Sequence, residues 1–262
     1  MKARSTLPMR RMRLQRGFTL VELSVATLIG LFLLGGLLTI VHNMRSTFTN
    51  QNQMSQMQDS ERLAMTLITD VIQEAGYYPD PTLETLQGAM LSTPPFNLTS
   101  AQAIAGTHNA AAPGDTISVQ FKTAPNDGVI NCRGTSNTSG ANQIFVSTFS
   151  VTGAGPTGTL NCTLGGTLGV NAPVALVSGV TNLQVLYGVK TNFALANDNA
   201  DTYLNAAQMN ANLSNWQNII CVKVTLTFDN SKLQASQPTG QPASIAFTRV
   251  ITVMSNGGVN TA

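Results

Sequence analysis

Residues 18–41 read FTLVELSVATLIGLFLLGGLLTIV, and this stretch decides how the chain folds at its N-terminal side. It holds 24 residues with a single charged side chain, Glu22. A helix rises about 1.5 Å per residue, so this one would span about 36 Å, more than the bilayer's hydrocarbon core of about 30 Å. The stretch therefore predicts a membrane-spanning helix.

A cleaved secretory signal is the main alternative for this stretch. Such a signal has an apolar core of about 7–15 residues, followed by a site of the A-x-A kind. The core here is longer, and no such site precedes His42. Arg10-Arg11 would fit a twin-arginine signal, but the long core argues against that signal too.

The basic residues gather ahead of the apolar stretch. Residues 1–17 carry no acid and six basic side chains, which are Lys2, Arg4, Arg10, Arg11, Arg13 and Arg16. The remainder keeps eight basic residues against 12 acidic ones, a net charge of −4. The positive-inside rule places residues 1–17 in the cytoplasm and the following domain outside. A nucleic-acid-binding protein would instead need a basic face on its folded domain, so no nucleic-acid partner is expected.

Glu22 is the informative side chain of the apolar stretch. A carboxylate in a membrane helix costs roughly 2.5–3.5 kcal/mol at the bilayer centre, and less near the interface. No Lys, Arg or His lies within residues 18–41 to pair with it. Either Glu22 reaches interfacial water, or its partner comes from another chain or from a new terminus.

Arg16-Gly17-Phe18-Thr19-Leu20-Val21-Glu22-Leu23 resembles the prepilin peptidase site of type IV pilins and of type II secretion pseudopilins. The resemblance implies cleavage between Gly17 and Phe18 on the cytoplasmic side, followed by N-methylation of Phe18. It also implies that Glu22 pairs with the N-terminal ammonium of a neighbouring subunit during assembly. A glycine fits the cleavage step, because backbone without a side chain enters a narrow cleft.

The helical pattern continues beyond Val41, although polar residues appear. Residues 42–75 contain neither Pro nor Gly, and Gly76 with Pro79 then supplies stop signals. Apolar residues recur intermittently along the stretch, at Met44, Phe48, Leu63, Leu67, Ile68, Val71 and Ile72. One helix of about 55 residues is the simplest prediction, with residues 42–76 amphipathic. Two helices broken near residues 49–53 are the alternative.

Residues 77–262 are predicted to form a β-rich globular domain. The stretch 80–115 looks loop-rich, and alternating segments follow it. The predicted strands are Thr116–Phe121, Gln143–Val151, Val174–Leu176, Leu183–Gly188, Ile219–Phe228 and Ile245–Met254. The expected fold class is α+β, with the long N-terminal helix packed on one antiparallel sheet. This is also the fold that the resemblance to type IV pilins implies.

A second resemblance narrows the family. Val180–Gly188 (VTNLQVLYG) is similar to a segment of PilW-type minor pilins, as are Leu67–Tyr77 and Asp201–Ala206 with Trp216 ahead of Cys221–Phe228. The family often carries an Arg-Asn pair after the last strand, and this chain has Ser255-Asn256 instead. Tyr187 and Trp216 are expected to be core or rim aromatics with no ligand role.

The cysteines predict one disulfide and one thiol in an exported domain. Cys132 and Cys162 flank the strand predicted at 143–151, so a disulfide between them would close the hairpin-like segment that contains this strand. Cys221 lies in a predicted strand and is expected to be a buried thiol. No zinc-ligand spacing occurs. The acids of Asn197–Asp201 could offer oxygens to calcium, but the full calcium-loop pattern is missing, so a solvated turn is favoured and no metal or cofactor is expected.

No catalytic motif such as G-x-S-x-G, H-E-x-x-H or G-x-x-x-x-G-K-[ST] occurs, so no enzyme is expected. The PilW resemblance implies a minor pilin that helps assemble a type IV pilus. A minor pseudopilin of type II secretion and a pilus-tip adhesin are the alternatives. The implied partners are major and minor pilins, prepilin peptidase, the inner-membrane assembly platform and membrane lipid. The implied location is the bacterial inner membrane in a single pass, with the domain in the periplasm, and then the pilus.

Overall fold

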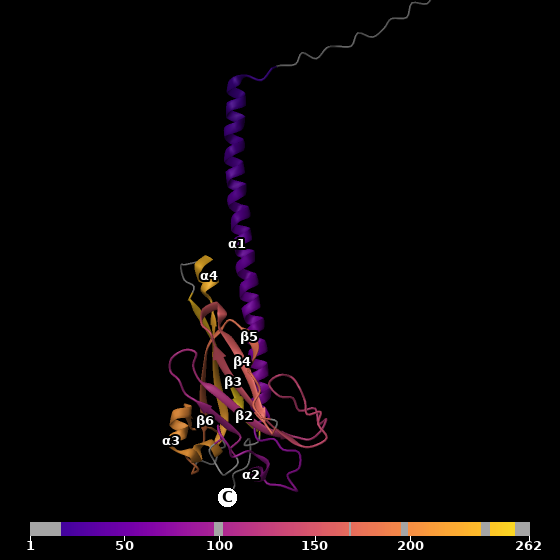
Figure 1. Ribbon diagram of the computed structural model, residues 1–262. Helices are drawn as coiled ribbons and strands as arrows, with labels where there is room; N and C mark the ends of the chain where they lie inside the picture. Colours follow the sequence, from indigo (N-terminus) through magenta and orange to yellow (C-terminus); the bar gives the residue numbers. More distant parts are fainter. Residues whose placement is uncertain (1–16, 97–101, 168, 195–198, 237–241, 255–262) are drawn as a thin grey trace, which may run out of the picture. The chain divides into compact units, whose positions relative to one another are not determined.

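The computed structural model describes residues 17–96, 102–167, 169–194, 199–236 and 242–254 (Figure 1). The chain divides into two compact units, Met1–Thr49 and Asn50–Ala262. Most of the basic leader, residues 1–16, lies outside the described residues. Helix α1 (Leu20–Gln73) contributes residues to both units.

Helix α1 is one element of 54 residues, as predicted, and the alternative break near residues 49–53 is absent from it. It ends at Gln73, close to the predicted stop at Gly76. Gly76 has a φ of 74°, a conformation that glycine adopts without strain, and its N–H donates to the Gln120 carbonyl at 2.9 Å. This hydrogen bond joins the helix terminus to the first sheet.

Nine strands are described, all within the second unit, and they form two antiparallel sheets. The five-stranded sheet has the order β1 (Ile104–Thr107), β2 (Thr116–Thr123), β3 (Gln143–Thr152), β4 (Thr159–Gly166), β5 (Val174–Ser178). The four-stranded sheet has the order β7 (Thr202–Leu204), β6 (Val180–Val189), β8 (Ile219–Asp229), β9 (Ser244–Thr252). The short helices are α2 (Leu86–Ala89), η1 (Gly155–Thr157), α3 (Ala206–Ala211), η2 (Leu213–Gln217) and α4 (Ser231–Ser236).

The α+β class and the antiparallel pairing are confirmed, but the expectation of one sheet is wrong. Three strands were not expected: β1, β4 and β7. The stretch 80–115, expected to be loop, contains α2 and β1. Several predicted ends also shift: β6 begins at Val180, and β9 ends at Thr252, two residues before the predicted Met254.

The sheets bury one face each through alternation of apolar residues. In the four-stranded sheet, Leu183 pairs with Leu226 and Val185 with Val224, and all four side chains are buried. In the five-stranded sheet, Ile117 pairs with Phe149 and Phe121 with Phe145, and these four side chains are also buried. The expected alternation of β8 is therefore confirmed.

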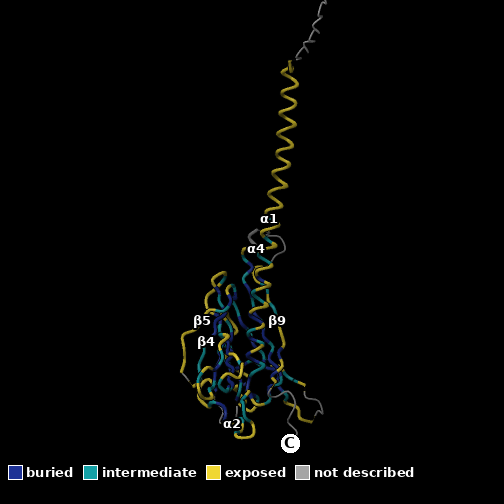
Figure 2. The backbone as a smooth tube through the Cα atoms, turned by 90° about the vertical axis from the view of Figure 1, so that its right-hand side faces the viewer, coloured by how far each residue is buried: buried dark blue, intermediate teal, exposed yellow. Residues whose placement is uncertain are grey.

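The C-terminal part of α1 completes this core. Its buried residues recur at helical spacing and belong to the same cluster as the inner faces of both sheets; they are Met57, Ala64, Met65, Ile68, Val71 and Ile72. Each large aliphatic side chain buried in this way contributes about 1.5–3 kcal/mol. Figure 2 shows the buried backbone confined to the second unit. Met44, Phe48 and Leu63 were expected in the apolar stripe, but they are exposed.

Tyr187 and Trp216 lie in the core, as expected. Both side chains are buried, and their rings meet edge to face with centroids 4.8 Å apart. The Trp216 indole N–H donates to the Asn210 side-chain oxygen at 3.0 Å. As the chain's sole tryptophan, Trp216 provides an intrinsic probe of this core.

A buried carboxylate fastens the loop between β1 and β2 to the second sheet. Asp115 accepts hydrogen bonds from the backbone N–H groups of Asn109 at 2.8 Å and of Val185 at 2.7 Å. Gly114 lies against β6 with a φ of 94°, and a Cβ there would meet the Leu183 carbonyl oxygen at 2.1 Å. Only glycine fits this approach between the loop and the strand.

Candidate functional site: the N-terminal segment and the disulfide

The peptide bond between Gly17 and Phe18 lies just ahead of α1 in backbone that is neither helix nor strand. Nothing lies within 4 Å of the position where a Gly17 Cβ would stand. The Phe18 side chain is 86% exposed. Backbone that is uncovered and free of regular hydrogen bonding is the kind that a protease can bind.

Thr19 and Glu22 form a capping box at the start of α1. The Thr19 hydroxyl accepts from the Glu22 N–H at 3.3 Å, and the Glu22 carboxylate accepts from the Thr19 N–H at 3.3 Å. The Thr19 hydroxyl also approaches that carboxylate at 3.2 Å. This capping role of Glu22 was not expected, although the T-x-x-E pattern in the sequence is its signature. Among the described residues, no basic side chain forms an ion pair with Glu22.

Every large apolar side chain in residues 20–41 of α1 is exposed. The most apolar window of this helix has a mean hydropathy of 2.3, and none of that window is buried. Length and composition therefore allow α1 to cross a membrane. Figure 2 shows this half of the helix exposed along its whole length.

Hydroxyl groups within the apolar segment are satisfied by the helix itself. The Ser24 hydroxyl donates to the Val21 carbonyl at 2.9 Å, and the Thr39 hydroxyl donates to the Gly35 carbonyl at 3.0 Å. The Thr27 hydroxyl bonds the carbonyls of Leu23 and Ser24. Because a polar group left unsatisfied in lipid costs several kcal/mol, these internal bonds suit a lipid or protein environment equally well.

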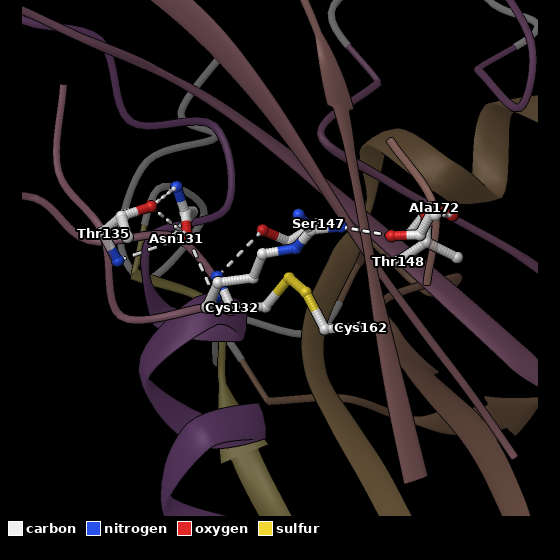
Figure 3. Close-up of a disulfide and its surroundings, with 9 residues drawn as sticks. Asn131, Cys132, Thr135, Ser147, Thr148, Cys162 and Ala172 are labelled. Carbon is white, nitrogen blue, oxygen red and sulfur yellow. Dashed lines mark hydrogen bonds between the residues drawn. A yellow bond between two sulfur atoms is a disulfide. The ribbon is translucent and has the colours of Figure 1, made fainter. Parts of the chain in front are cut away.

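A disulfide joins Cys132 and Cys162, with their Cα atoms 6.1 Å apart (Figure 3). Cys162 belongs to β4, and Cys132 lies in the segment between β2 and β3. Both residues are buried in the main core. The Cys132 N–H donates to the Ser147 hydroxyl of β3 at 3.3 Å, and β3 pairs with β4, the strand that carries Cys162.

The segment that carries Cys132 is held by its own hydrogen bonds. Asn131 uses its side chain to bond Thr135 and the Arg133 N–H. The Arg133 guanidinium donates a hydrogen bond to the Ala172 carbonyl oxygen at 2.5 Å. The disulfide is therefore part of a tied loop over the five-stranded sheet.

Cys221 is a buried thiol, with its sulfur 3.5 Å from the Tyr203 hydroxyl. Of the calcium candidate Asn197–Asp201, residues 197 and 198 lie outside the described residues. Asp201 is engaged within its own loop: hydrogen bonds from the Thr191 hydroxyl and the Asn192 N–H hold the pKa of its carboxyl at about 2. Within the described ranges, no group of three His, Cys, Asp or Glu could hold a metal ion.

The structure keeps the predicted site residues in two places. Gly17, Phe18 and Glu22 belong to the first unit, and the disulfide belongs to the second. Gly17 and Phe18 lie ahead of α1, Glu22 lies in its first turn, and all three residues are exposed.

Two family models match the chain. Residues 145–258 match the family described as type IV pilus-assembly protein W. Residues 12–38 match the prokaryotic N-terminal methylation motif. The first match covers the strands from β3 to β9, and the second covers the leader junction and the start of α1.

No curated protein matches the chain. Among solved structures, it is similar to a type IV-like pilin from Thermus thermophilus, at 12% identity over 78% of this chain and 97% of that one. The TM-score is 0.38, which is too low for this likeness to carry an argument. The two family matches, together with the long apolar helix and the antiparallel sheets, point to a structural protein. Over residues 145–258 the chain is therefore similar to the type IV pilus-assembly protein W family, and residues 12–38 carry the N-terminal methylation motif.

Proposed function

We propose that this protein is a minor pilin, a subunit that primes or joins the assembly of a type IV pilus. The observation that carries the proposal is the presence of two family signatures in one chain: the methylation motif at 12–38 and the PilW match at 145–258. The methylation motif alone would suit a pseudopilin of type II secretion equally well. The PilW match favours the pilus.

Processing is the first step of the proposed function. Prepilin peptidase cuts between Gly17 and Phe18 and methylates the Phe18 amine. The exposed, non-helical backbone at this bond supports the proposal, because the enzyme needs an extended substrate that no other element covers. Removal of residues 1–17 also takes away six of the chain's 14 basic residues.

Glu22 then acts in assembly through its charge. Its carboxylate accepts hydrogen bonds from Thr19, but hydrogen bonds do not neutralise it, and residues 18–41 offer no cation. The ammonium group of Phe18 on a neighbouring subunit supplies one. A charge-assisted hydrogen bond of this kind contributes about 1.5–3 kcal/mol, which favours the helix that is correctly placed among its neighbours.

The apolar half of α1 provides both the anchor and the assembly surface. Before assembly, its exposed side chains lie in the bacterial inner membrane, with the second unit on the periplasmic side. During assembly, the helix exchanges lipid for the apolar helices of other pilins. Its hydroxyl groups lose no hydrogen bonds in this exchange, because they are already bonded to carbonyl groups of the same helix.

Two substitutions of Glu22 separate its charge from its capping bonds. Glu22→Gln keeps a T-x-x-Q capping box but removes the charge, whereas Glu22→Ala removes both. Loss of about 1.5–3 kcal/mol corresponds to a roughly tenfold to hundredfold weaker association. We expect both variants to be processed and both to fail to restore pili to a strain that lacks the native gene.

The measurement is the number of surface pili, with the size of the membrane-bound protein as the control for processing. Glu61→Gln, a substitution in the same helix, should behave as the native chain. If Glu22→Gln restores pili while Glu22→Ala does not, capping is the role of Glu22 and the charge proposal is wrong.

A further inference from the structure

A cavity of about 540 Å³ opens beside the C-terminal end of α1, within the second unit. Its apolar wall is made of Tyr77, Val129, Ile130 and Met254. Three of these are exposed large apolar residues, at 40% for Tyr77, 39% for Ile130 and 65% for Met254. Apolar side chains that gather around a hollow at the surface are typical of a place where a partner binds. We call it the Glu74 groove.

Two carboxylates stand in this apolar groove: Asp70 in the last turn of α1, and Glu74 four residues later, just past the end of the helix at Gln73. The Glu74 side chain is half-buried. One of its oxygens, Oε2, is enclosed and has no hydrogen-bond partner in the part of the chain that is described. An enclosed acceptor without a partner is costly, unless a donor from outside reaches it.

The charges around Glu74 are all negative. Burial and the neighbouring carboxylates of Asp70 and Asp127 together raise the pKa of this carboxyl to about 7, although a hydrogen bond from the Ile130 N–H lowers it. The nearby strand β2 carries Lys122, but its ammonium is engaged by both carboxylate oxygens of Glu84, at 2.5 and 2.7 Å. The groove therefore combines an apolar wall with uncompensated negative charge.

We propose that the Glu74 groove receives the basic side chain of a neighbouring pilin subunit, with its alkyl stem on the apolar wall and its cationic end at the Glu74 and Asp70 carboxylates. Lys and Arg bury their stems along apolar surface and keep the charged end at a polar group, so they match both features. The assignment of a pilin as the partner rests on the proposed function. The chain's own residues 255–262 follow Met254, but they contain no Lys or Arg and cannot supply the charge.

The groove can be tested with n-butylammonium as a probe that imitates a lysine side chain. The full chain in detergent micelles, labelled on the methyl groups of Met and Ile, is titrated at pH 8 and followed by NMR. We expect the signals of Met254 and Ile130 to shift in a saturable manner. n-Butanol has the same stem and no charge. It should bind at least about tenfold more weakly than n-butylammonium, because it makes no charge-assisted hydrogen bond.

Glu74→Gln is the decisive variant, since it keeps the shape of the side chain and removes the charge. It should weaken n-butylammonium binding by about tenfold and leave n-butanol unchanged. Lowering the pH from 8 to 5.5 should weaken the binding of n-butylammonium to the native chain in the same way, because the Glu74 carboxyl becomes protonated. Glu61→Gln, on the same helix and outside the groove, should bind as the native chain does.

Several results would overturn the proposal. Equal binding of n-butylammonium and n-butanol would make the groove a simple apolar hollow. Unchanged binding in Glu74→Gln would place the cation elsewhere. Binding that emerges only in a variant ending at Met254 would mean that the chain's own C-terminal segment occupies the groove.

A complementation assay then tests the partner. In a strain that lacks the native gene, Glu74→Lys should be processed normally but fail to restore pili, whereas Glu61→Lys should restore them. Pili restored by Glu74→Lys would contradict the docking of a basic side chain. If the native chain itself restores no pili, the proposed function fails, while the NMR titration still decides whether the groove binds a cation.

Discussion

Glu22 and Glu74 lie near the two ends of α1: Glu22 stands in an apolar stretch, and Glu74 is half-buried in an apolar groove. Glu22 could be singled out from the sequence, because residues 18–41 contain no cation to pair with it. Glu74 could not, because its burial depends on the loop that carries Ile130 and on the distant Met254. A side chain that is buried by remote segments leaves no local signal in the sequence.

The pH dependence of stability tests the surroundings of Glu74. Its pKa rises from an ordinary 4.5 to about 7 on folding, so the folded state holds the proton more tightly. Its contribution to stability is therefore fully present below about pH 4.5 and is lost as the pH rises through 7. Because the carboxyl is only half-buried, solvent screening reduces the effect to roughly 1–2 kcal/mol.

We expect the stability of Glu74→Gln, relative to the native chain, to increase by roughly 1–2 kcal/mol between pH 4 and pH 8. Thermal unfolding of the full chain in micelles, followed by the fluorescence of Trp216, measures this difference. Glu61→Gln serves as the control for a substitution on the same helix. A difference between Glu74→Gln and native that does not vary with pH would show that Glu74 titrates as an ordinary exposed carboxyl.

At the scale of elements, long and strongly patterned segments could be predicted. Helix α1 follows from an apolar run joined to a segment without Pro or Gly, and β8 follows from the alternation of Val222, Val224 and Leu226. The last turns of α1 pack on the strands because Ile68 and Ile72 recur at helical spacing. These patterns are local, so the sequence alone reveals them.

The missed strands depended on partners far away in the chain. Strand β4 has a short alternation at Leu160, Cys162 and Leu164, which could have been found, but Gly and Thr residues weaken it. Strand β1 has only four residues and includes Gly106, where a Cβ would meet the Tyr187 hydroxyl at 2.2 Å. In the sequence, Gly106 is typical of a loop. In the structure, a glycine is needed there because Tyr187 of the second sheet occupies the space of a side chain. The separation into two sheets likewise results from long-range pairing.

The disulfide should stabilise the second unit measurably. Replacing Cys132 and Cys162 together with Ala removes a link that closes a 30-residue separation. Chain-entropy arithmetic predicts a loss of roughly 3–4 kcal/mol. For a unit of this size, each kcal/mol lowers Tm by about 2–4 °C. The fluorescence of Trp216 during thermal unfolding gives the shift.

Reduction provides the matched control for this prediction. Dithiothreitol should lower Tm of the native chain to that of the double variant and leave the double variant unchanged. Cys221→Ala should keep its sensitivity to dithiothreitol, because Cys221 is a thiol outside the bridge. A native chain whose Tm does not respond to the reductant would mean that the bridge does not stabilise the fold.

At the scale of the whole molecule, the two units differ in whether their apolar side chains are exposed or buried. The first exposes apolar side chains from Leu20 to Val41, while the second has a buried core that begins at Met57 of α1 and contains Trp216. The division at Thr49–Asn50 therefore separates an anchor from a domain with its own core. Helix α1 itself crosses this division, since it runs from Leu20 to Gln73.

A chain that begins at Asn50 should fold alone. It retains every residue of the main core, so the truncated protein should be soluble without detergent, with Trp216 protected from aqueous quenchers. Its Tm should lie within a few degrees of the value for the second unit in the full chain. Acrylamide quenching and size-exclusion chromatography measure both properties. A truncated chain that aggregates, or whose Trp216 is fully quenched, would show that the second unit depends on the first.

The most direct test of the proposed role as a processed pilin is mass spectrometry of the N-terminus of the membrane-bound protein from the producing cell. A terminal peptide that begins at Phe18 and carries one methyl group on its amine is the predicted result. Gly17→Leu, with a side chain at the cleavage position, should yield the chain with its leader attached. A native chain that still begins with residues 1–17 would contradict the central claim.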